Sequence, residues 1–341
     1  MMGNNRIAVI IPYFQREPGI LRRSVQSALR QQGIPCPYII IIDDASPIAA
    51  DVELSDLMPK YAQDITVIRQ SNGGPGAARN TGIEAVPDQY ELVAFLDSDD
   101  EWDPDHLRNA LEAFHSGCDF FFSDHLDYSG TTTRFGRLQK QGTFRADDHP
   151  RVHPGSTLRW FSGDFVDQLI RDFVVQTATV VVRRSVLGRH RFPEEFRRAG
   201  EDHLLWLKIA AGGAKVAFSE RVACRLGRGV NIYEASVWGT EGALERTVDF
   251  DGLLTRMRRL YARTDDQKRL LSRRIAVARR DFIRNLLHDI ATIRLPSAGL
   301  VWRQFRQDPW TLVVLIPDSI QIALERKKRS LEESRTGKAQ Q

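Results

Sequence analysis

Two groups of carboxylates follow short apolar runs and could take part in chemistry at one edge of a sheet. Asp43 and Asp44 come directly after Tyr38–Ile42, and the acidic segment Asp97–Asp99 follows Leu92–Leu96. Ligands of an open α/β sheet bind at the carboxyl ends of its strands, so we expect both groups to line one crevice. Like charges this close repel one another, which indicates that a positive group compensates them.

The spacing Asp97-x-Asp99 is typical of a site for a hard divalent cation. Carboxylate oxygens are preferred ligands of Mg²⁺ and Mn²⁺, and these ions often bind substrate phosphates as well. A single Asp after a strand is more often a turn or helix cap, but two acidic pairs at one edge favour a site. The neighbouring Asp100, Glu101 and Asp103 are interpreted as acidic residues at the start of the next helix.

A glycine-rich segment, 71–80, would let the backbone approach a ligand closely before a helix begins. The amino terminus of a helix favours anions, and Arg79 early in this helix makes a nucleotide contact more credible. The segment lacks the Gly-Lys-Ser/Thr of a phosphate-binding Walker loop, and it does not follow the first strand as a dinucleotide fingerprint would.

The elements that must position these residues alternate between strands and helices. Apolar runs predict strands at 7–11, 38–42, 65–69, 92–96 and 120–122, and helices are expected at 19–30, 75–85 and from 103 or 104 to 115. The alternation predicts an α/β fold with a parallel sheet covered on both faces. Further along, the pattern predicts a polar loop at 131–163, a returning strand at 173–183, a helix at 201–211, a strand at 215–218 and helices from Gly242 onward.

The whole chain gives little support for nucleic-acid or disulfide-rich classes. The formal net charge of the 341 residues is only +4, and three widely spaced cysteines without a C-x-x-C pair suit a reducing cytosol. The first apolar run is too short for a signal peptide, and no window approaches the roughly 20 apolar residues of a membrane span. The run 310–316 is expected to end at Pro317. We therefore expect a cytoplasmic protein that is soluble or peripheral to a membrane.

Four motifs, taken together in this order and spacing, resemble glycosyltransferase family 2. They are Ile10-Ile11-Pro12-Tyr13, Ile42-Asp43-Asp44-Ala45-Ser46, Asn72-Gly73-Gly74 with Ala78-Arg79-Asn80-x-Gly82, and Phe95-Leu96-Asp97-Ser98-Asp99-Asp100-x-Trp102. The resemblance implies the GT-A fold, a Rossmann-like mixed and mostly parallel sheet with helices on both faces. It also implies transfer of a sugar with inversion, usually from a UDP-sugar, with Mg²⁺ or Mn²⁺ as cofactor.

The resemblance also implies roles for particular residues. Asp44 would contact the uracil edge, Asp97 would lie near the ribose, and Asp99 would ligate the metal bound to the diphosphate. The metal would stabilise the charge that develops on UDP. The metal ligands implied are Asp99 and Asp97, and the residues implied to bind the nucleotide sugar are Pro12, Tyr13, Arg16, Asp43, Asp44, Gly74, Arg79, Asp97, Ser98 and Arg228.

The family needs a general base on the acceptor side, and its usual form is an acidic pair that opens a helix. Glu201 and Asp202 resemble that pair, with Asp202 as the base and Glu201 as a residue that orients it or binds the acceptor. The alternative is an acidic pair that only caps the helix. His203 stands where many members carry a further acidic residue, and its role is left open. In the loop 225–231, Arg228 is either a phosphate partner or part of a solvated turn.

The carboxyl-terminal region is predicted to be a basic helical extension. We expect a transferase domain at 1–240, with a nucleotide half at 1–128 and an acceptor half at 129–240, then helices at 241–329 and a disordered tail at 330–341. Three alternatives remain for the helices: packing on the sheet domain, peripheral binding to an anionic membrane at the cytoplasmic face, or homodimerisation. A lipid-linked acceptor would make membrane binding useful.

The sequence thus predicts an inverting, metal-dependent, non-processive glycosyltransferase. Processive synthases carry a Gln/Arg-x-x-Arg-Trp motif, and Ser156 stands where Arg159-Trp160 would need Gln or Arg. The segment 10–19 resembles bacterial exopolysaccharide glucosyltransferases of the succinoglycan type, which implies UDP-glucose as donor and a lipid-linked oligosaccharide as acceptor. The alternatives are a sugar nucleotidyltransferase, whose basic glycine-rich loop after strand one is absent, and an inactive sugar-nucleotide-binding scaffold.

Overall fold

The computed structural model describes residues 6–128, 130–229, 238–240 and 242–338, and for 326–338 it describes the backbone alone. The contacts divide the chain into two compact units. The sheet unit comprises Met1–Arg197 and Glu201–Asn231, and the helical unit comprises Arg198–Gly200 and Ile232–Gln341. The domain boundary expected at 240 and 241 stays a prediction, and residue 241 lies outside the described residues.

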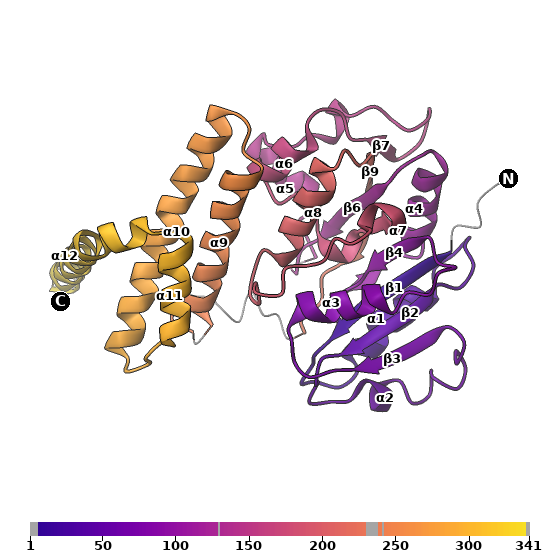
Figure 1. Ribbon diagram of the computed structural model, residues 1–341, viewed down its shortest axis with the longest axis horizontal. Helices are drawn as coiled ribbons and strands as arrows, with labels where there is room; N and C mark the ends of the chain where they lie inside the picture. The colour runs from indigo at the N-terminus through magenta and orange to yellow at the C-terminus, as the bar shows by residue number, and fades with distance from the viewer. Residues whose placement is uncertain (1–5, 129, 230–237, 241, 339–341) are drawn as a thin grey trace. The chain divides into compact units, whose positions relative to one another are not determined.

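The sheet unit contains one mixed sheet with the order β3-β2-β1-β4-β8-β6-β9-β5, and β7 pairs with β9 (Figure 1). Neighbouring strands β3, β2, β1 and β4 are parallel, as are β6 and β9, whereas β8 runs antiparallel to β4 and β6. The strands are β1 Ile7–Tyr13, β2 Tyr38–Asp43, β3 Ile65–Arg69, β4 Leu92–Phe95, β5 Glu101–Trp102, β6 Phe120–Leu126, β7 Leu158–Trp160, β8 Val181–Arg183 and β9 Val216–Arg225.

Helices cover both faces of this sheet, which confirms the predicted fold class. Alternate residues of β1 point to opposite faces: Val9 lies in a core cluster with Val25 of α1, while Ile10 contacts Gly82 of α3. The helices of the sheet unit are α1 Ile20–Leu29, α2 Ala50–Glu53, α3 Pro75–Glu84, α4 His106–His115, α5 Arg134–Gln141, α6 Phe165–Arg171, α7 Arg184–Leu187 and α8 Glu201–Ala211, with 3₁₀ turns η1 Ala146–Asp148 and η2 Thr177–Thr179.

The strand directions bring the predicted acidic residues to one edge. Because β1, β2 and β4 are parallel, their carboxyl ends lie together, and β2 ends at Asp43 while Asp97 comes two residues after β4. The strand β8 begins at this same edge, since it runs antiparallel to β4. The turn η2, which precedes β8, is therefore also placed near the acidic segment.

The segment 131–163, expected as a loop, contains α5, η1 and β7, and three further element predictions for the sheet unit were wrong in extent. Helix α4 begins at His106 rather than at 103 or 104 and has no acidic residue in its first turn, because Glu101–Trp102 pairs with β9 and keeps the chain extended. The segment expected as a strand at 173–183 forms η2 and a three-residue strand, and β9 extends to Arg225 because it pairs along the whole of β6.

The helical unit is built from α9 Ala243–Leu260, α10 Asp265–Ala291, α11 Ala298–Gln307 and α12 Trp310–Lys338. Helices α9 and α10 run side by side (Figure 1), and their apolar residues Val248, Phe282 and Ile283 form the centre of a separate core. One expectation was wrong here, because helix α12 continues through Pro317. The disordered tail expected at 330–341 stays a prediction, and residues 339–341 lie outside the described residues.

None of the helices described in this chain is sufficiently long and apolar to cross a membrane.

Candidate active site

The acidic segment after β4 is held at the sheet edge by polar contacts from two neighbouring elements. Ser24 of α1 donates to the carbonyl of Asp97 at 3.1 Å, and Gln15 donates from Nε2 to the hydroxyl of Ser98 at 3.1 Å. The amide of Gln15 in turn donates to Ser46, next to the predicted uracil-binding residue Asp44. These bonds fix the acidic segment relative to the ends of β1 and β2.

Arg79 of α3 joins the acidic segment to the helix that carries the predicted base. Its Nη2 lies 2.6 Å from Oδ1 of Asp97, and its Nη1 lies 3.1 Å from Oε1 of Glu201. The side chain is almost fully buried, which by itself lowers the pKa of a guanidinium, but the two carboxylates outweigh burial and the pKa is raised. Arg79, predicted to contact the nucleotide, has these two carboxylates as its partners in the structure.

Glu201 and Asp202 occupy different environments, although they are adjacent at the start of α8. Glu201 is 8% exposed, and burial together with the neighbouring Asp202 raises its pKa to about 7. Asp202 is half-buried, and its Oδ2 accepts a hydrogen bond of 2.6 Å from Thr177 of η2. Each oxygen of Asp202 accepts one hydrogen bond, so lone pairs remain for a substrate proton. A half-buried carboxylate thus lies beside a buried one, and the roles of Asp202 as base and Glu201 as its support stay predictions.

A backbone loop at 226–229 binds the two carboxylates that follow Asp97. The amide of Gly229 donates to Asp99 at 2.8 Å, and the amide of Gly227 donates to Asp100 at 2.9 Å. A Cβ at Gly227 would lie 1.6 Å from the carbonyl oxygen of Asp99, so only glycine permits this approach. Arg228 between them is exposed, and the continuation at 230 and 231 lies outside the described residues.

The glycine-rich turn before α3 contacts Asp44 instead of standing open for an anion. Asp44 accepts hydrogen bonds of 2.8 Å from the amides of Gly73 and Gly74 and from the side chain of Gln70. Asp43 is fully buried and accepts from the amides of Ser46 and Ala50, which fixes the turn after β2. The two carboxylates therefore shape the edge, and further contacts to a nucleotide stay predictions.

The remaining predicted donor residues differ in accessibility. Pro12 is half-buried, Arg16 is exposed, and Tyr13 is packed in the core, where burial raises the pKa of its hydroxyl to about 12. Tyr13 is therefore part of the hydrophobic core at this edge, while Pro12 and Arg16 remain accessible to a ligand.

The charge balance of the acidic segment suits a divalent cation. Burial and then the neighbouring Asp97 raise the pKa of Asp99, and the pKa of the deeply buried Asp100 is raised further by burial, Asp97 and Asp99. Among the described residues no group of three or more His, Cys, Asp or Glu side chains is arranged to hold a metal. A cation that arrives with a diphosphate needs only one or two protein carboxylates, and Asp97 and Asp99 fit that donor set.

Sequence reasoning missed several residues that build this edge, among them Gln15, Thr177, Gly227 and Gly229. The Gly-x-Gly spacing at 227–229 was the one available signal, because paired glycines often mark close backbone approach. The role of His203 is now visible: its Nε2 bonds to the carbonyl oxygen of Leu169 at 2.8 Å, which ties α6 to the start of α8.

Comparisons with known proteins agree with this architecture. The chain is 34% identical over 235 residues to the succinoglycan biosynthesis protein ExoW of Rhizobium meliloti, covering 67% of this chain and 71% of that protein. It is 29% identical over 195 residues to the succinoglycan biosynthesis protein ExoO of the same organism, covering 57% and 53% respectively.

Solved structures show the same fold. The structure of S. aureus TarS 1–349 in complex with UDP-GlcNAc superposes with a TM-score of 0.55 and 16% identity, covering 95% of this chain and 92% of that one. Its fold is that of the GT-A transferases, as is the mixed sheet described above. The sequence profile described as glycosyl transferase family 2 matches residues 8–188, more than half of the chain. Together with the similarity to ExoW, this match shows that the chain belongs to glycosyltransferase family 2 and is a glycosyltransferase.

Proposed function

We propose that this protein transfers glucose, with inversion and without processivity, from UDP-glucose to a hydroxyl of a saccharide acceptor. The observation that carries the proposal is the bridge through Arg79, which joins Asp97 at the donor edge to Glu201 beside Asp202. Donor-edge carboxylates and a candidate base are thus held in one site. The name of the relative ExoW and the UDP-GlcNAc bound to TarS support a nucleotide-sugar donor and an exopolysaccharide product.

In the proposed reaction, Asp202 accepts the proton of the acceptor hydroxyl while that oxygen attacks the anomeric carbon. The bond between the anomeric carbon and the UDP oxygen breaks, and UDP leaves from the opposite face. Glu201 and Arg79 hold the first turn of α8 against the donor edge, so the base stays oriented during the attack. Asp202 is placed for this role by the hydroxyl of Thr177.

Asp99 and Asp97 would hold Mg²⁺ or Mn²⁺ together with the diphosphate. When bound, the cation stabilises negative charge on the leaving UDP. Asp99 is oriented for this by the amide of Gly229, which occupies one of its oxygens and leaves lone pairs on the other. Arg228, exposed in the same loop, would contribute a positive charge near the phosphates.

The test is a panel of UDP-sugars and GDP-mannose, each incubated in Mg²⁺, in Mn²⁺ or in EDTA. The readout is release of the free nucleoside diphosphate. Slow hydrolysis of UDP-glucose that requires the cation is expected, because donor cleavage does not need the acceptor. If only another nucleotide sugar were hydrolysed, that nucleotide sugar would replace UDP-glucose as the proposed donor. A sugar nucleotidyltransferase would instead form a nucleotide sugar from a nucleoside triphosphate and a sugar phosphate. An inactive scaffold would bind the UDP-sugar without releasing UDP from it.

The helical unit supports attachment to an anionic membrane, where a lipid-linked acceptor would lie. Helix α12 buries Thr311 and Ile322 on one side, and apolar side chains elsewhere on α11 and α12 are exposed. These exposed residues are Trp302, Trp310, Leu312, Val313, Ile316, Ile320 and Leu324. The sequence continues with Arg326-Lys327-Lys328-Arg329, so a basic cluster follows the apolar stripe, as in helices that lie in the surface of anionic bilayers.

Flotation with vesicles of anionic and of purely zwitterionic lipid tests this attachment. Binding to anionic vesicles at low salt is expected, and the substitutions Ile316→Ser and Ile320→Ser together should reduce it. Failure to float under any condition, combined with a dimeric mass that these substitutions convert to a monomer, would assign the same surface to homodimerisation.

A further inference from the structure

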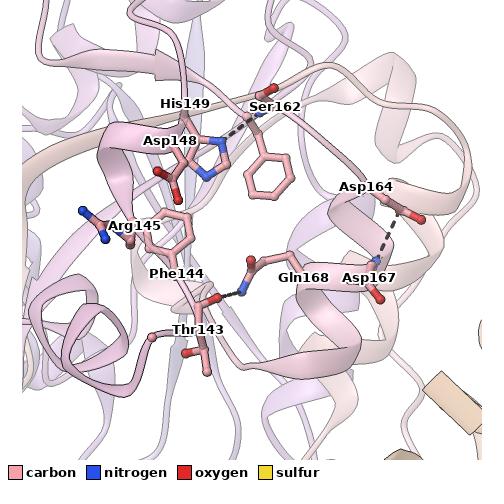
Figure 2. Close-up of a pocket in the computed structure, with 11 residues that line it drawn as sticks. Thr143, Phe144, Arg145, Asp148, His149, Ser162, Asp164, Asp167 and Gln168 are labelled. Carbon is pink, nitrogen blue, oxygen red and sulfur yellow. Dashed lines mark hydrogen bonds between the residues drawn. The ribbon is translucent and has the colours of Figure 1, made fainter. Parts of the chain in front are cut away.

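A cavity of about 300 Å³ lies in the acceptor half of the sheet unit, and none of its lining residues belongs to the acidic edge (Figure 2). It is lined by the segment 142–149, which follows α5, and by residues 161–168 at the start of α6. This volume is at the lower end of the range for small-ligand sites in proteins. Nothing in the proposed transfer reaction uses it.

The walls of this cavity are aromatic and internally braced. The ring of His149 lies against Phe161, with centroids 4.6 Å apart, and stacks on Phe144 at 5.3 Å. The amide of Ser162 donates to Nδ1 of His149 at 2.9 Å, and Gln168 donates to the carbonyl oxygen of Thr143 at 3.2 Å (Figure 2). The last bond joins the two lining segments, so the cavity has a defined shape.

Polar groups with unused hydrogen-bonding capacity face this aromatic wall. Because Nδ1 of His149 accepts a hydrogen bond, the neutral ring carries its proton on Nε2. That ring is 7% exposed, and within the described part of the chain Nε2 has no hydrogen-bond partner. The same holds for the carboxylate of Asp148 and for Oε1 of Gln168. Asp148 is exposed and Gln168 is half-buried, so these polar atoms are solvated and available to a ligand that displaces water.

The charges of the cavity favour a neutral ligand over an anion. Asp148, Asp164, Asp167 and Arg145 line it, and Arg171 pairs with Asp167 at 2.7 Å. The lining therefore has no excess of positive charge that would attract a phosphate or a carboxylate. A sugar ring suits the site, since its C–H face can pack on an aromatic surface while its hydroxyls both donate and accept hydrogen bonds.

We propose that this cavity binds one hexopyranose ring of the acceptor saccharide, remote from the hydroxyl that reacts. This proposal rests on the proposed function, because it specifies the acceptor of the same reaction. The ring would pack against Phe161, and its hydroxyls would bond to Asp148, His149 and Gln168.

The cavity is connected to the predicted base through a single helix. Gln168 precedes Leu169 in α6, and the carbonyl oxygen of Leu169 bonds to His203, the residue after Asp202. None of the residues that line the cavity is Thr177, Glu201 or Asp202, so we assign the cavity to a different sugar from the one that reacts. On this assignment the acceptor contains at least two sugars, and a monosaccharide should be a poor acceptor.

Saturation-transfer NMR with cellobiose, laminaribiose and gentiobiose tests the cavity without requiring the natural acceptor. These probes are neutral glucose disaccharides that differ only in linkage. At least one should bind to the full chain, and Asp148→Asn and Phe161→Ala should each weaken binding about tenfold or more. The matched control is Asp265→Asn, which makes the same change at an exposed residue of α10 outside the cavity lining. Unchanged melting temperatures would show that the variants fold.

The outcomes separate the cavity from the donor chemistry. Cation-dependent hydrolysis of UDP-glucose should be unaltered in Asp148→Asn and Phe161→Ala, because neither residue belongs to the donor edge. Disaccharide binding without any donor hydrolysis would overturn the proposed reaction and leave the cavity assignment standing. Donor hydrolysis with no disaccharide bound at tens of millimolar, or with equal binding to both variants, would overturn the cavity assignment.

Discussion

The two units of this chain both bury carboxylates, but they compensate the negative charge in different ways. In the helical unit, Asp308 accepts from two nitrogens of Arg279 at 2.6 and 3.0 Å, and Asp249 pairs with Arg303. In the sheet unit, Asp99 and Asp100 accept hydrogen bonds from backbone amides instead, and their pKa values are raised by burial and by neighbouring carboxylates. Asp249 and Asp308 are thus each paired with an arginine, whereas Asp99 and Asp100 are not.

This difference separates structural acids from functional ones. A carboxylate paired with an arginine needs no further partner, whereas a partly exposed carboxylate beside other carboxylates is stabilised by an incoming cation. Arg79 is shared between Asp97 and Glu201, so it does not neutralise the acidic edge. The uncompensated negative charge thus lies where a metal-bound diphosphate would enter. Four predictions test this contrast between the two units.

The largest effect is expected for Asp202→Asn, which removes the carboxylate of the sheet unit that we propose as the general base. Sugar transfer should fall by about two to four orders of magnitude, as for a missing general base, while UDP binding persists. Transfer assays and calorimetry measure the two properties. The exposed Asp265→Asn in α10 is the matched control and should leave both unchanged. Normal turnover of Asp202→Asn would place the base elsewhere.

Arg79→Ala should strongly destabilise the sheet unit. It leaves Asp97 and the buried Glu201 without their shared cation, and breaking a buried ion pair from one side costs about 3–5 kcal/mol. Urea unfolding of the variant measures this cost. Arg79→Lys keeps the charge and should recover part of the stability but little transfer, because lysine cannot bridge both carboxylates with a planar fork. An unchanged unfolding free energy in the alanine variant would contradict the bridge.

Asp99→Ala should weaken UDP binding by about ten- to a hundredfold in Mn²⁺, because the proposed cation loses a ligand. In EDTA, the variant and the parent protein should bind UDP equally. Calorimetric titrations with and without the cation make the comparison. If the loss were the same in both conditions, Asp99 would act through the loop at 226–229 rather than through a metal.

The smallest effect concerns Asp251, a fully buried acid of the helical unit whose Oδ2 accepts a hydrogen bond of 3.0 Å from Gln304. Burial and then the nearby Asp308 raise its pKa to about 7, from an unfolded value near 4. The native state therefore holds an extra proton between these values, so the unfolding free energy should fall as pH rises from about 4 to 7. Asp251→Asn should reduce this slope in thermal unfolding followed across pH. Identical slopes for the variant and the parent would show that Asp251 ionises normally.

The sequence was sufficient for the local parts of the fold. The strand β2 and its terminal Asp43 could be placed because a β-branched run and the charge that ends it are neighbours in the chain. Prediction from the sequence failed where strands pair with distant segments. The pattern at Glu101–Trp102 predicts the start of a helix, but in the structure these residues pair with Arg225 and Cys224 of β9. Helix propensity at that point is overridden by tertiary pairing.

For the site, the sequence by itself determined which residue types stand at the strand ends, and hence the acidic edge and the acidic pair that opens α8. Tertiary structure decided which of them share a partner. Arg79 and Glu201 are 122 positions apart, and Gly229 and Asp99 are 130 apart, so no local pattern encodes either contact. The cavity beside α6 depends likewise on packing between segments. Periodicity records which face of an element is apolar, and only the folded chain brings remote polar groups within bonding distance.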